Sequence, residues 1–185
     1  MGEGTVISDV GDAMAAEQAL ARAGIEPVVL SDKEGLALIN GTDGMLGMLI
    51  LALADLEDLF MTADLATAMS VESLLGTDRA FAQDLVALRP HPGQATSAAA
   101  LRAFLADSDI VASHREDTEH LVQDAYSLRC SPQVTGAARD TADHARTVAQ
   151  RELASVIDNP VVLPDGRVES NGNFHGAPVA YVLDF

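Results

Sequence analysis

The chain has 185 residues, 48% of them hydrophobic, so it can bury the core of one or two domains and does not have the composition of a disordered segment. Its 28 acidic and 11 basic residues give a formal net charge of −17, which repels nucleic-acid phosphates and anionic membranes. The single cysteine excludes an intrachain disulfide, and the first residues resemble no secretion signal, so we expect a cytoplasmic protein.

The composition favours helices. Aromatic residues make up 4% of the chain and tryptophan is missing, which suits closely packed helices better than a β-sandwich or barrel. The longest uncharged apolar run, Met45 to Ala54, is too short to span a membrane, which takes roughly 20 residues. We therefore predict a mainly α protein.

The first half of the chain predicts a short helix and a long one. Asp12 to Ala23 has helix-forming residues and stops at a glycine, and Val28 to Leu30 is a short strand-like piece. Thr42 to about Leu75 predicts a long buried helix with Gly76 as its C-terminal stop. Arg89 to Gly93 is rich in helix-breaking residues and predicts a loop before the next helix.

The second half predicts another long helix and a hairpin. Ser131 offers an N-cap, Pro132 suits the first helical position, and the apolar spacing continues to about Asp158. Two apolar segments flank the turn Pro164–Gly166, which predicts a small β-hairpin. Pro178 to Phe185 begins another apolar helix, and we expect the natural chain to continue beyond it.

The densest polar cluster is residues 122–130. Arg129 carries a planar guanidinium that can hold a carboxylate bidentately, and Tyr126 carries a phenol that can exchange a proton. The pair could bind and deprotonate an amino acid. The structural alternative is a packed tyrosine with its hydroxyl satisfied and an arginine paired to one of the many acids.

Two further clusters could either bind a ligand or have a purely structural role. Ser170 to Gly176 contains two glycines and two amides that could contact a ligand, or it could be an ordinary turn. Asn40 and Thr42 could contact a ligand, or one of them could cap the long helix that follows.

Other chemistries lack their motifs. His114 and His120 are six residues apart, which does not match the spacing of two metal ligands on one helical face, so we expect no metal. Neither a glycine-rich phosphate loop nor a Gly-x-Ser-x-Gly nucleophile motif occurs.

Taken together and in order, three segments closely resemble histidine ammonia-lyases, within the aromatic amino acid ammonia-lyase family. These are Glu34-Gly-Leu-Ala-Leu-Ile-Asn-Gly-Thr42, Val122-Gln-Asp-Ala-Tyr-Ser-Leu-Arg-Cys-Ser-Pro-Gln-Val134 and Gly172-Asn-Phe-His175. The resemblance implies a long-helix bundle of the ammonia-lyase/fumarase-like type with a small β-hairpin. It places residues 1–40 at the end of an N-terminal domain and 41–185 at the start of the central bundle.

The resemblance also implies an activity and roles for five residues. The family converts L-histidine to trans-urocanate and ammonia, as a homotetramer whose active sites draw on more than one subunit. Tyr126 would remove the β-proton and Arg129 would anchor the substrate carboxylate. Asn40, Gln123 and Phe174 would line the substrate and the electrophile.

The chain departs from the family in one decisive feature. The family's electrophile, 4-methylidene-imidazol-5-one (MIO), forms from an internal Ala-Ser-Gly, and this tripeptide is missing from the 185 residues. In the family it precedes the region that matches Met1, and a further acidic active-site residue follows the region that matches Phe185. We therefore expect an internal segment that is inactive alone and that functions with the missing flanking segments.

Two smaller departures keep other functions open. Asp43 stands where glutamine is more usual, and Thr135 where histidine or methionine is common. A phenylalanine or tyrosine ammonia-lyase, or an aminomutase, would share the tyrosine and arginine. A non-catalytic helical oligomerisation module would instead be insensitive to loss of the Tyr126 hydroxyl.

Overall fold

The computed structural model describes residues 1–116 and 123–185. They divide into two compact units, which we describe separately. The first unit contains Met1–Gly41 and Asp158–Phe174, and the second contains Thr42–Ile157 and His175–Phe185.

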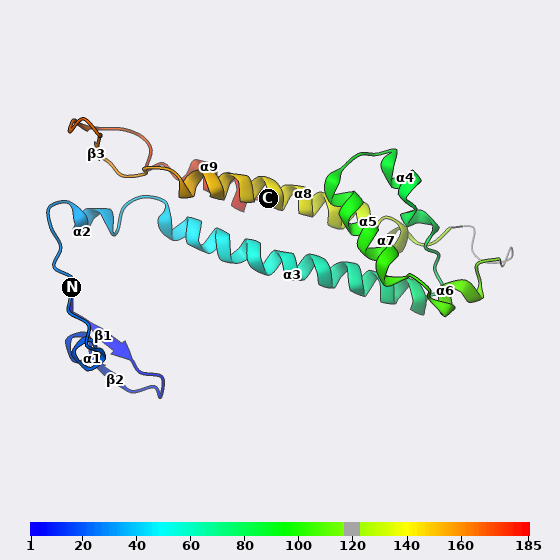
Figure 1. The fold of residues 1–185 in the computed structure, drawn as a ribbon, viewed down its shortest axis with the longest axis horizontal. Helices are drawn as coiled ribbons and strands as arrows, with labels where there is room; N and C mark the ends of the chain where they lie inside the picture. The colour runs from blue at the N-terminus through cyan, green and yellow to red at the C-terminus, as the bar shows by residue number, and fades with distance from the viewer. Residues whose placement is uncertain (117–122) are drawn as a thin grey trace. The chain divides into compact units, whose positions relative to one another are not determined.

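The second unit is built on two long antiparallel helices, α3 (Asp43–Ser73) and α8 (Ser131–Leu153), which lie side by side (Figure 1). Leucines of α3 pack against alanines of α8, and α9 (Ala177–Leu183) adds the fully buried Val179 to the same core. Small alanines on α8 let the two helices approach closely. The core residues are Leu46, Leu49, Leu53, Phe60, Ala142, Ala145, Ala149 and Val179.

Helix α5 (Pro92–Phe104) crosses α8 with almost no space between the backbones. A Cβ added to Gly93 would lie 2.1 Å from the carbonyl oxygen of Gly136, and a Cβ added to Gly136 would lie 2.3 Å from the backbone nitrogen of Gln94. Both positions therefore require glycine. The carboxylate of Asp140 on α8 also accepts a hydrogen bond from the Gly93 backbone N–H (2.8 Å).

Short elements surround a second core at the far end of α3. They are the 3₁₀ helix η1 (Arg79–Phe81), α4 (Gln83–Ala87), α6 (Asp109–Ser113) and α7 (Tyr126–Arg129). Phe81, Leu101, Val111 and Leu128 are buried there together with Val71 of α3. The side chain of Leu128 thus attaches α7 to the ends of α3 and α5.

The first unit consists of two small antiparallel hairpins and short helices. Strands β1 (Thr5–Ile7) and β2 (Ala13–Ala15) pair, and α1 (Ala16–Ala23) and α2 (Glu34–Ala37) follow. Strands β3 (Val161–Val162) and β4 (Val168–Glu169) form the second hairpin.

The mainly helical fold, the two long helices, the hairpin and the final helix confirm the predictions from sequence. Three local predictions were wrong. Val28 to Leu30 forms no strand, because it pairs with no neighbouring strand in the described structure. Residues 13–15 pair with β1, so the first helix begins only at Ala16, and Pro92 begins α5 instead of lying in a loop.

The limits of α8 also differ from the prediction. Its N-cap is Cys130, and Ser131 is already helical. The helix ends at Leu153, because Ala154 departs from helical geometry, and so it stops before the predicted end at about Asp158.

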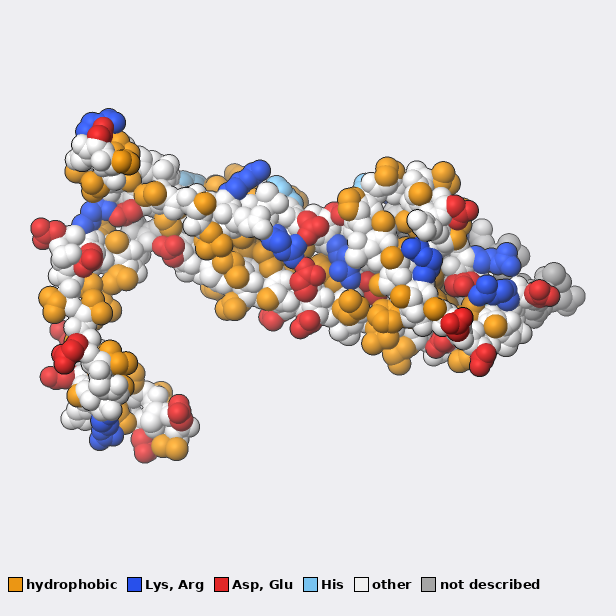
Figure 2. Space-filling view, in the orientation of Figure 1, with side chains coloured by type: hydrophobic (Ala, Val, Ile, Leu, Met, Phe, Trp, Pro, Cys, Tyr) orange, Lys and Arg blue, Asp and Glu red, His pale blue; other side chains and the backbone are white. Residues whose placement is uncertain are grey.

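Several hydrophobic side chains of α3 are exposed. In Figure 2, hydrophobic side chains on the surface are coloured orange. Those of α3 include Met48, Leu51, Leu59, Met61, Leu65 and Met69. None of the described helices is both long enough and apolar enough to span a membrane.

Candidate active site

Tyr126 and Arg129 lie together on the single turn of α7. Their spacing of three residues puts them on one face of a helix, while Leu128 points into the core. The Arg129 guanidinium carbon lies 4.7 Å from the centroid of the Tyr126 ring. Tyr126 remains 73% exposed, and within the described parts of the chain no acidic side chain pairs with Arg129. Among the described residues, Tyr126 is therefore not packed and Arg129 is not paired to an acid.

Three polar side-chain atoms at or near this pair are buried without a hydrogen-bond partner among the described residues. They are Arg129 Nε, Ser131 Oγ and Gln133 Oε1, at the junction of α7 and α8. Buried polar groups are ordinarily paired, and leaving one unsatisfied costs about 1–3 kcal/mol.

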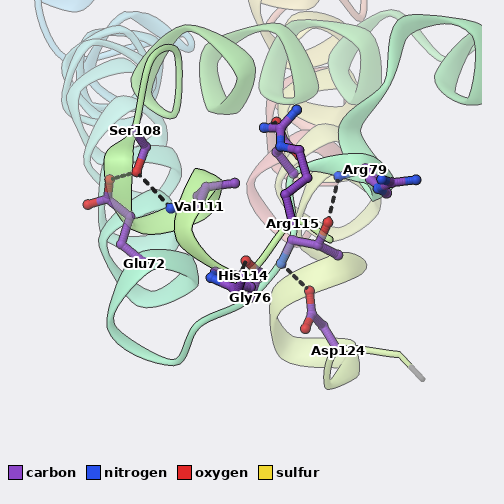
Figure 3. A network of polar contacts seen from close by, with 10 residues as sticks. Glu72, Gly76, Arg79, Ser108, Val111, His114, Arg115 and Asp124 are labelled. Atoms are coloured by element: carbon purple, nitrogen blue, oxygen red, sulfur yellow. Dashed lines mark hydrogen bonds and ion pairs between the residues drawn. The ribbon is translucent and has the colours of Figure 1, made fainter. Parts of the chain in front are cut away.

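Gln123 and Asp124 precede α7 and differ in environment. Gln123 is exposed, whereas Asp124 is buried, and its carboxylate accepts a hydrogen bond from the Thr77 backbone N–H at 2.7 Å (Figure 3). Val122, the first residue of this motif, lies outside the described residues.

Asn40 lies in the first unit and is held by Asp158. The Asn40 side-chain amide donates to one carboxylate oxygen of Asp158 (3.4 Å), and the Lys33 ammonium pairs with the other. The hydrogen bond from Lys33 is the main cause that lowers the pKa of Asp158 below its ordinary value. Burial opposes this effect, and the Asn159 backbone N–H and the Asn40 amide lower the pKa further.

Asn40 and Thr42 were the two candidates for the cap of the long helix. Thr42 is the N-cap residue of α3, but its side chain makes no capping bond. Its buried hydroxyl donates instead to the carboxylate of Glu152 on α8 (2.7 Å), because the antiparallel packing brings that residue alongside. The Asn40 side-chain NH₂ donates to Asp158, and the N-cap position of α3 belongs to Thr42.

Phe174, at the end of the first unit, follows a segment that is also tied to Asp158. The Asn171 amide donates to the carbonyl of Asp158 (3.0 Å), and the Asn171 backbone N–H donates to the Asn159 side chain (2.9 Å). The side-chain oxygen of Asn171 then accepts from the Asn173 backbone N–H (2.8 Å). Phe174 itself is 43% exposed.

The predicted site residues thus fall into two groups. Gln123, Tyr126 and Arg129 belong to the second unit, and Asn40 and Phe174 belong to the first, where Asp158 connects their segments. Sequence reasoning assigned no role to Asp158. The available signal was an acid directly before Asn159-Pro160, a pair that favours the end of a helix.

A buried ion pair in the second unit was also missed. Arg139 of α8 donates to Asp64 of α3 (2.8 Å) and to Ser97 of α5 (3.1 Å), and Asp64 is 1% exposed. The pair joins three helices, and breaking such a pair typically costs about 3–5 kcal/mol. We interpret it as a structural contact.

No group of three or more metal-ligating side chains occurs within residues 1–116 and 123–185. His114 donates from Nε2 to the carbonyl oxygen of Gly76 at 2.8 Å, and His120 lies outside the described residues.

Comparison with known proteins identifies similar sequences and structures. The family model described as aromatic amino acid lyase matches residues 1–185. Histidine ammonia-lyases from Streptomyces avermitilis and Streptomyces coelicolor are 63% and 62% identical over 185 residues, covering all of this chain and 36% of each relative. The chain therefore spans about a third of the length of these curated relatives.

Solved structures of related enzymes have the same fold. Tyrosine aminomutase from Streptomyces globisporus superposes with a TM-score of 0.88 at 38% identity, covering 99% of this chain and 38% of that one. Histidine ammonia-lyase from Trypanosoma cruzi gives 0.82 at 38% identity, covering 99% and 34%.

Proposed function

This chain belongs to the aromatic amino acid lyase family, and we propose that it supplies part of the active site of a histidine ammonia-lyase, which eliminates ammonia from L-histidine to give trans-urocanate. The observation that carries the proposal is the pairing of Tyr126 and Arg129 on α7, with 4.7 Å between guanidinium and ring. This pair lies in a chain that is 63% identical to a histidine ammonia-lyase.

In the proposed reaction each member of the pair has one task. Arg129 binds the substrate carboxylate through two parallel N–H···O bonds, because its planar guanidinium matches that geometry. This places the substrate above the exposed side chain of Tyr126, whose oxygen, in its deprotonated phenolate form, takes the proton from the β-carbon. The amino group leaves as ammonia, and the double bond forms between the α- and β-carbons.

The family's electrophile, MIO, activates the leaving amine when it is present. It forms from Ala-Ser-Gly, which does not occur among the 185 residues, so we propose that it comes from outside them. The side-chain amides fit such a group. Gln123 is exposed, and the Asn40 NH₂ directs one hydrogen towards Asp158 and retains another to donate to a carbonyl oxygen. The exposed ring of Phe174 would line the substrate.

We further propose that the enzyme is a homo-oligomer, a tetramer as in the family. The exposed apolar side chains of α3 support this, because soluble monomers rarely leave extended apolar surface uncovered. Each active site would then combine this segment with residues of other chains or segments.

A tyrosine or phenylalanine enzyme is the second candidate. It is favoured by the superposition with tyrosine aminomutase, whose TM-score of 0.88 exceeds the 0.82 of the Trypanosoma cruzi histidine enzyme. Both structures are 38% identical to this chain over the superposed residues, against 63% for the Streptomyces avermitilis histidine ammonia-lyase. Sequence identity therefore favours L-histidine as the substrate.

A chimeric enzyme tests the substrate. Residues 1–185 would replace the matched region of the Streptomyces avermitilis enzyme, and urocanate would be followed by its ultraviolet absorbance. We expect turnover of L-histidine within about tenfold of the parent enzyme, which corresponds to a barrier change of about 1.4 kcal/mol. We expect no turnover of L-phenylalanine or L-tyrosine, and none by the 185-residue chain alone.

A chimera that assembles like its parent but prefers an aromatic substrate other than histidine would support the second candidate. An assembled chimera with no activity on any of the three amino acids would contradict the proposed function. Sedimentation of each preparation distinguishes these outcomes from failure to assemble.

A further inference from the structure

The C-terminal end of α3 is a closely defined turn. The Gly76 backbone N–H donates to the carbonyl of Val71 (2.7 Å), and the Leu75 N–H donates to that of Glu72 (3.1 Å). Leu75 is left-handed, with φ of 52°. These are the bonds of a Schellman motif, which ends the helix and directs the following residues into a fixed path.

Two side chains from later in the sequence bind this turn, as Figure 3 shows. His114, at the end of α6, bonds to the Gly76 carbonyl through Nε2 (2.8 Å). The Asp124 carboxylate accepts from the Thr77 backbone N–H (2.7 Å). A Cβ on Gly76 would lie 3.3 Å from Asp124 Oδ2 and 3.3 Å from Val71, so the contact is closely packed.

Asp124 also lies next to the candidate active site in sequence. It follows Gln123, and α7 begins at Tyr126 after the N-cap residue Ala125. Leu128 is buried in the core at the other side of the same turn. The path of α7 is therefore constrained before the helix by the Asp124 carboxylate, within it by Leu128, and after it by the start of α8 at Ser131.

A carboxylate that accepts from a backbone N–H makes a charge-assisted bond, which is stronger than a bond between neutral groups. Asp124 is 7% exposed, so water competes little for this bond. Without it, Gln123 and the first residue of α7 would lose their attachment to α3, while Leu128 would keep α7 near the core. The expected result is a displaced Tyr126 in an otherwise folded chain.

We propose that Asp124 is a positioning residue for the active-site pair: by binding the Thr77 N–H, it holds α7 so that Tyr126 and Arg129 face the substrate correctly. This rests on the proposed function. A misplacement of about 1 Å can cost roughly 100-fold in rate, so the effect of losing the bond should appear in kcat.

The chain offers a matched control. Asp140 makes the same kind of contact, from its carboxylate to the Gly93 backbone N–H at 2.8 Å, but between α8 and α5. Both bonds join residues that are 47 positions apart in sequence. Asp140→Leu should therefore cost comparable stability without displacing α7.

The test compares Asp124→Leu, Asp124→Asn and Asp140→Leu in the chimera. Asp124→Leu should lower kcat per folded active site by about 10- to 100-fold. Asp124→Asn retains an oxygen acceptor for Thr77 and should restore kcat to within about threefold, and Asp140→Leu should also remain within about threefold. Thermal unfolding of each variant should show similar losses for the two leucine variants.

A second measurement needs no activity. In the 185-residue chain, hydrogen exchange of the Thr77 amide, followed by NMR, should be faster in Asp124→Leu and close to that of the unsubstituted chain in Asp124→Asn. Unchanged Thr77 exchange in Asp124→Leu would overturn the proposal even if that variant were inactive.

Three kinetic results would also overturn it: a kcat for Asp124→Leu within threefold of the unsubstituted chimera, an equal loss in Asp140→Leu, or no rescue by asparagine. An inactive unsubstituted chimera would instead contradict the proposed function. The two failures are therefore distinguishable.

Discussion

At the scale of single residues, the pairing of Tyr126 with Arg129 could be predicted because both lie within one turn of chain. A spacing of three residues becomes a contact as soon as the segment is helical, as α7 is. The contacts of Asp158 and Asp124 could not be predicted. Their partners Lys33 and Thr77 lie 125 and 47 residues away, and only the folded chain brings them together.

The Lys33–Asp158 contact predicts a pH dependence in the first unit. The pKa of Asp158 is lowered, chiefly by the hydrogen bond from Lys33. A carboxyl whose pKa is lowered by folding stabilises the fold above its unfolded pKa of about 3.9, and this contribution disappears as the pH falls through the lowered value. Lys33→Met should therefore destabilise the first unit at neutral pH, and the difference should shrink below about pH 4.

Thermal unfolding of the 185-residue chain and of Lys33→Met across this pH range measures the effect. Adding Asp158→Asn to Lys33→Met should remove the remaining dependence that arises from Asp158. A gap between the two proteins that stays constant or widens on acidification would contradict the assigned role of the Lys33 hydrogen bond.

At the scale of elements, the long helices were predictable because their apolar spacing extends over many turns. The start of α5 was not, because Pro92 and Gly93 are helix breakers in isolation. In the fold, Pro92 occupies the start of the helix, where its missing N–H costs nothing, and Gly93 faces Gly136. The need for glycine at position 136 arises from the crossing of two helices, which no local pattern reveals.

Replacing two helical glycines with alanine should have opposite effects on stability, because only one of them lies where α5 crosses α8. Gly136→Ala would place a methyl group 2.3 Å from the Gln94 backbone, so it should destabilise the second unit by about 1–3 kcal/mol or more. Gly47→Ala, in the interior of α3, meets nothing within 4 Å and should stabilise by up to about 1 kcal/mol.

Urea unfolding of the 185-residue chain, followed by helical circular dichroism, distinguishes the two variants. Gly47→Ala serves as the control for a general effect of replacing a helical glycine. A Gly136→Ala variant as stable as the unsubstituted chain would show that α5 and α8 do not cross as closely as described.

At the scale of the whole molecule, the fold class and the family could be predicted from three short motifs in a fixed order. The proposed boundary between residues 40 and 41 stays a prediction. The contacts also group residues 158–174 with the first 41 residues, although these segments are far apart in sequence. Local sequence patterns do not reveal this grouping, because it depends on the bonds of Asp158 to Asn40 and Lys33.

The acidic surface and the exposed apolar side chains of α3 have opposite effects on the association of identical chains. A net charge of −17 opposes association of identical chains, whereas burial of Met48, Leu51 and Met61 would favour it. Association would therefore have to bury enough apolar surface to outweigh charge repulsion. This is the physical condition that the proposed homo-oligomer must meet.

The central claim is that this segment contributes the phenol that takes the β-proton, and one comparison in the chimera tests it most directly. The chain has two tyrosines, Tyr126 on α7 and Tyr181 on α9, and both are largely exposed, at 73% and 68%. The turnover of L-histidine should fall about 100-fold or more in Tyr126→Phe, the usual range for loss of a general base, and stay within about twofold in Tyr181→Phe. Equal turnover in the two phenylalanine variants, at the level of the unsubstituted chimera, would contradict the claim.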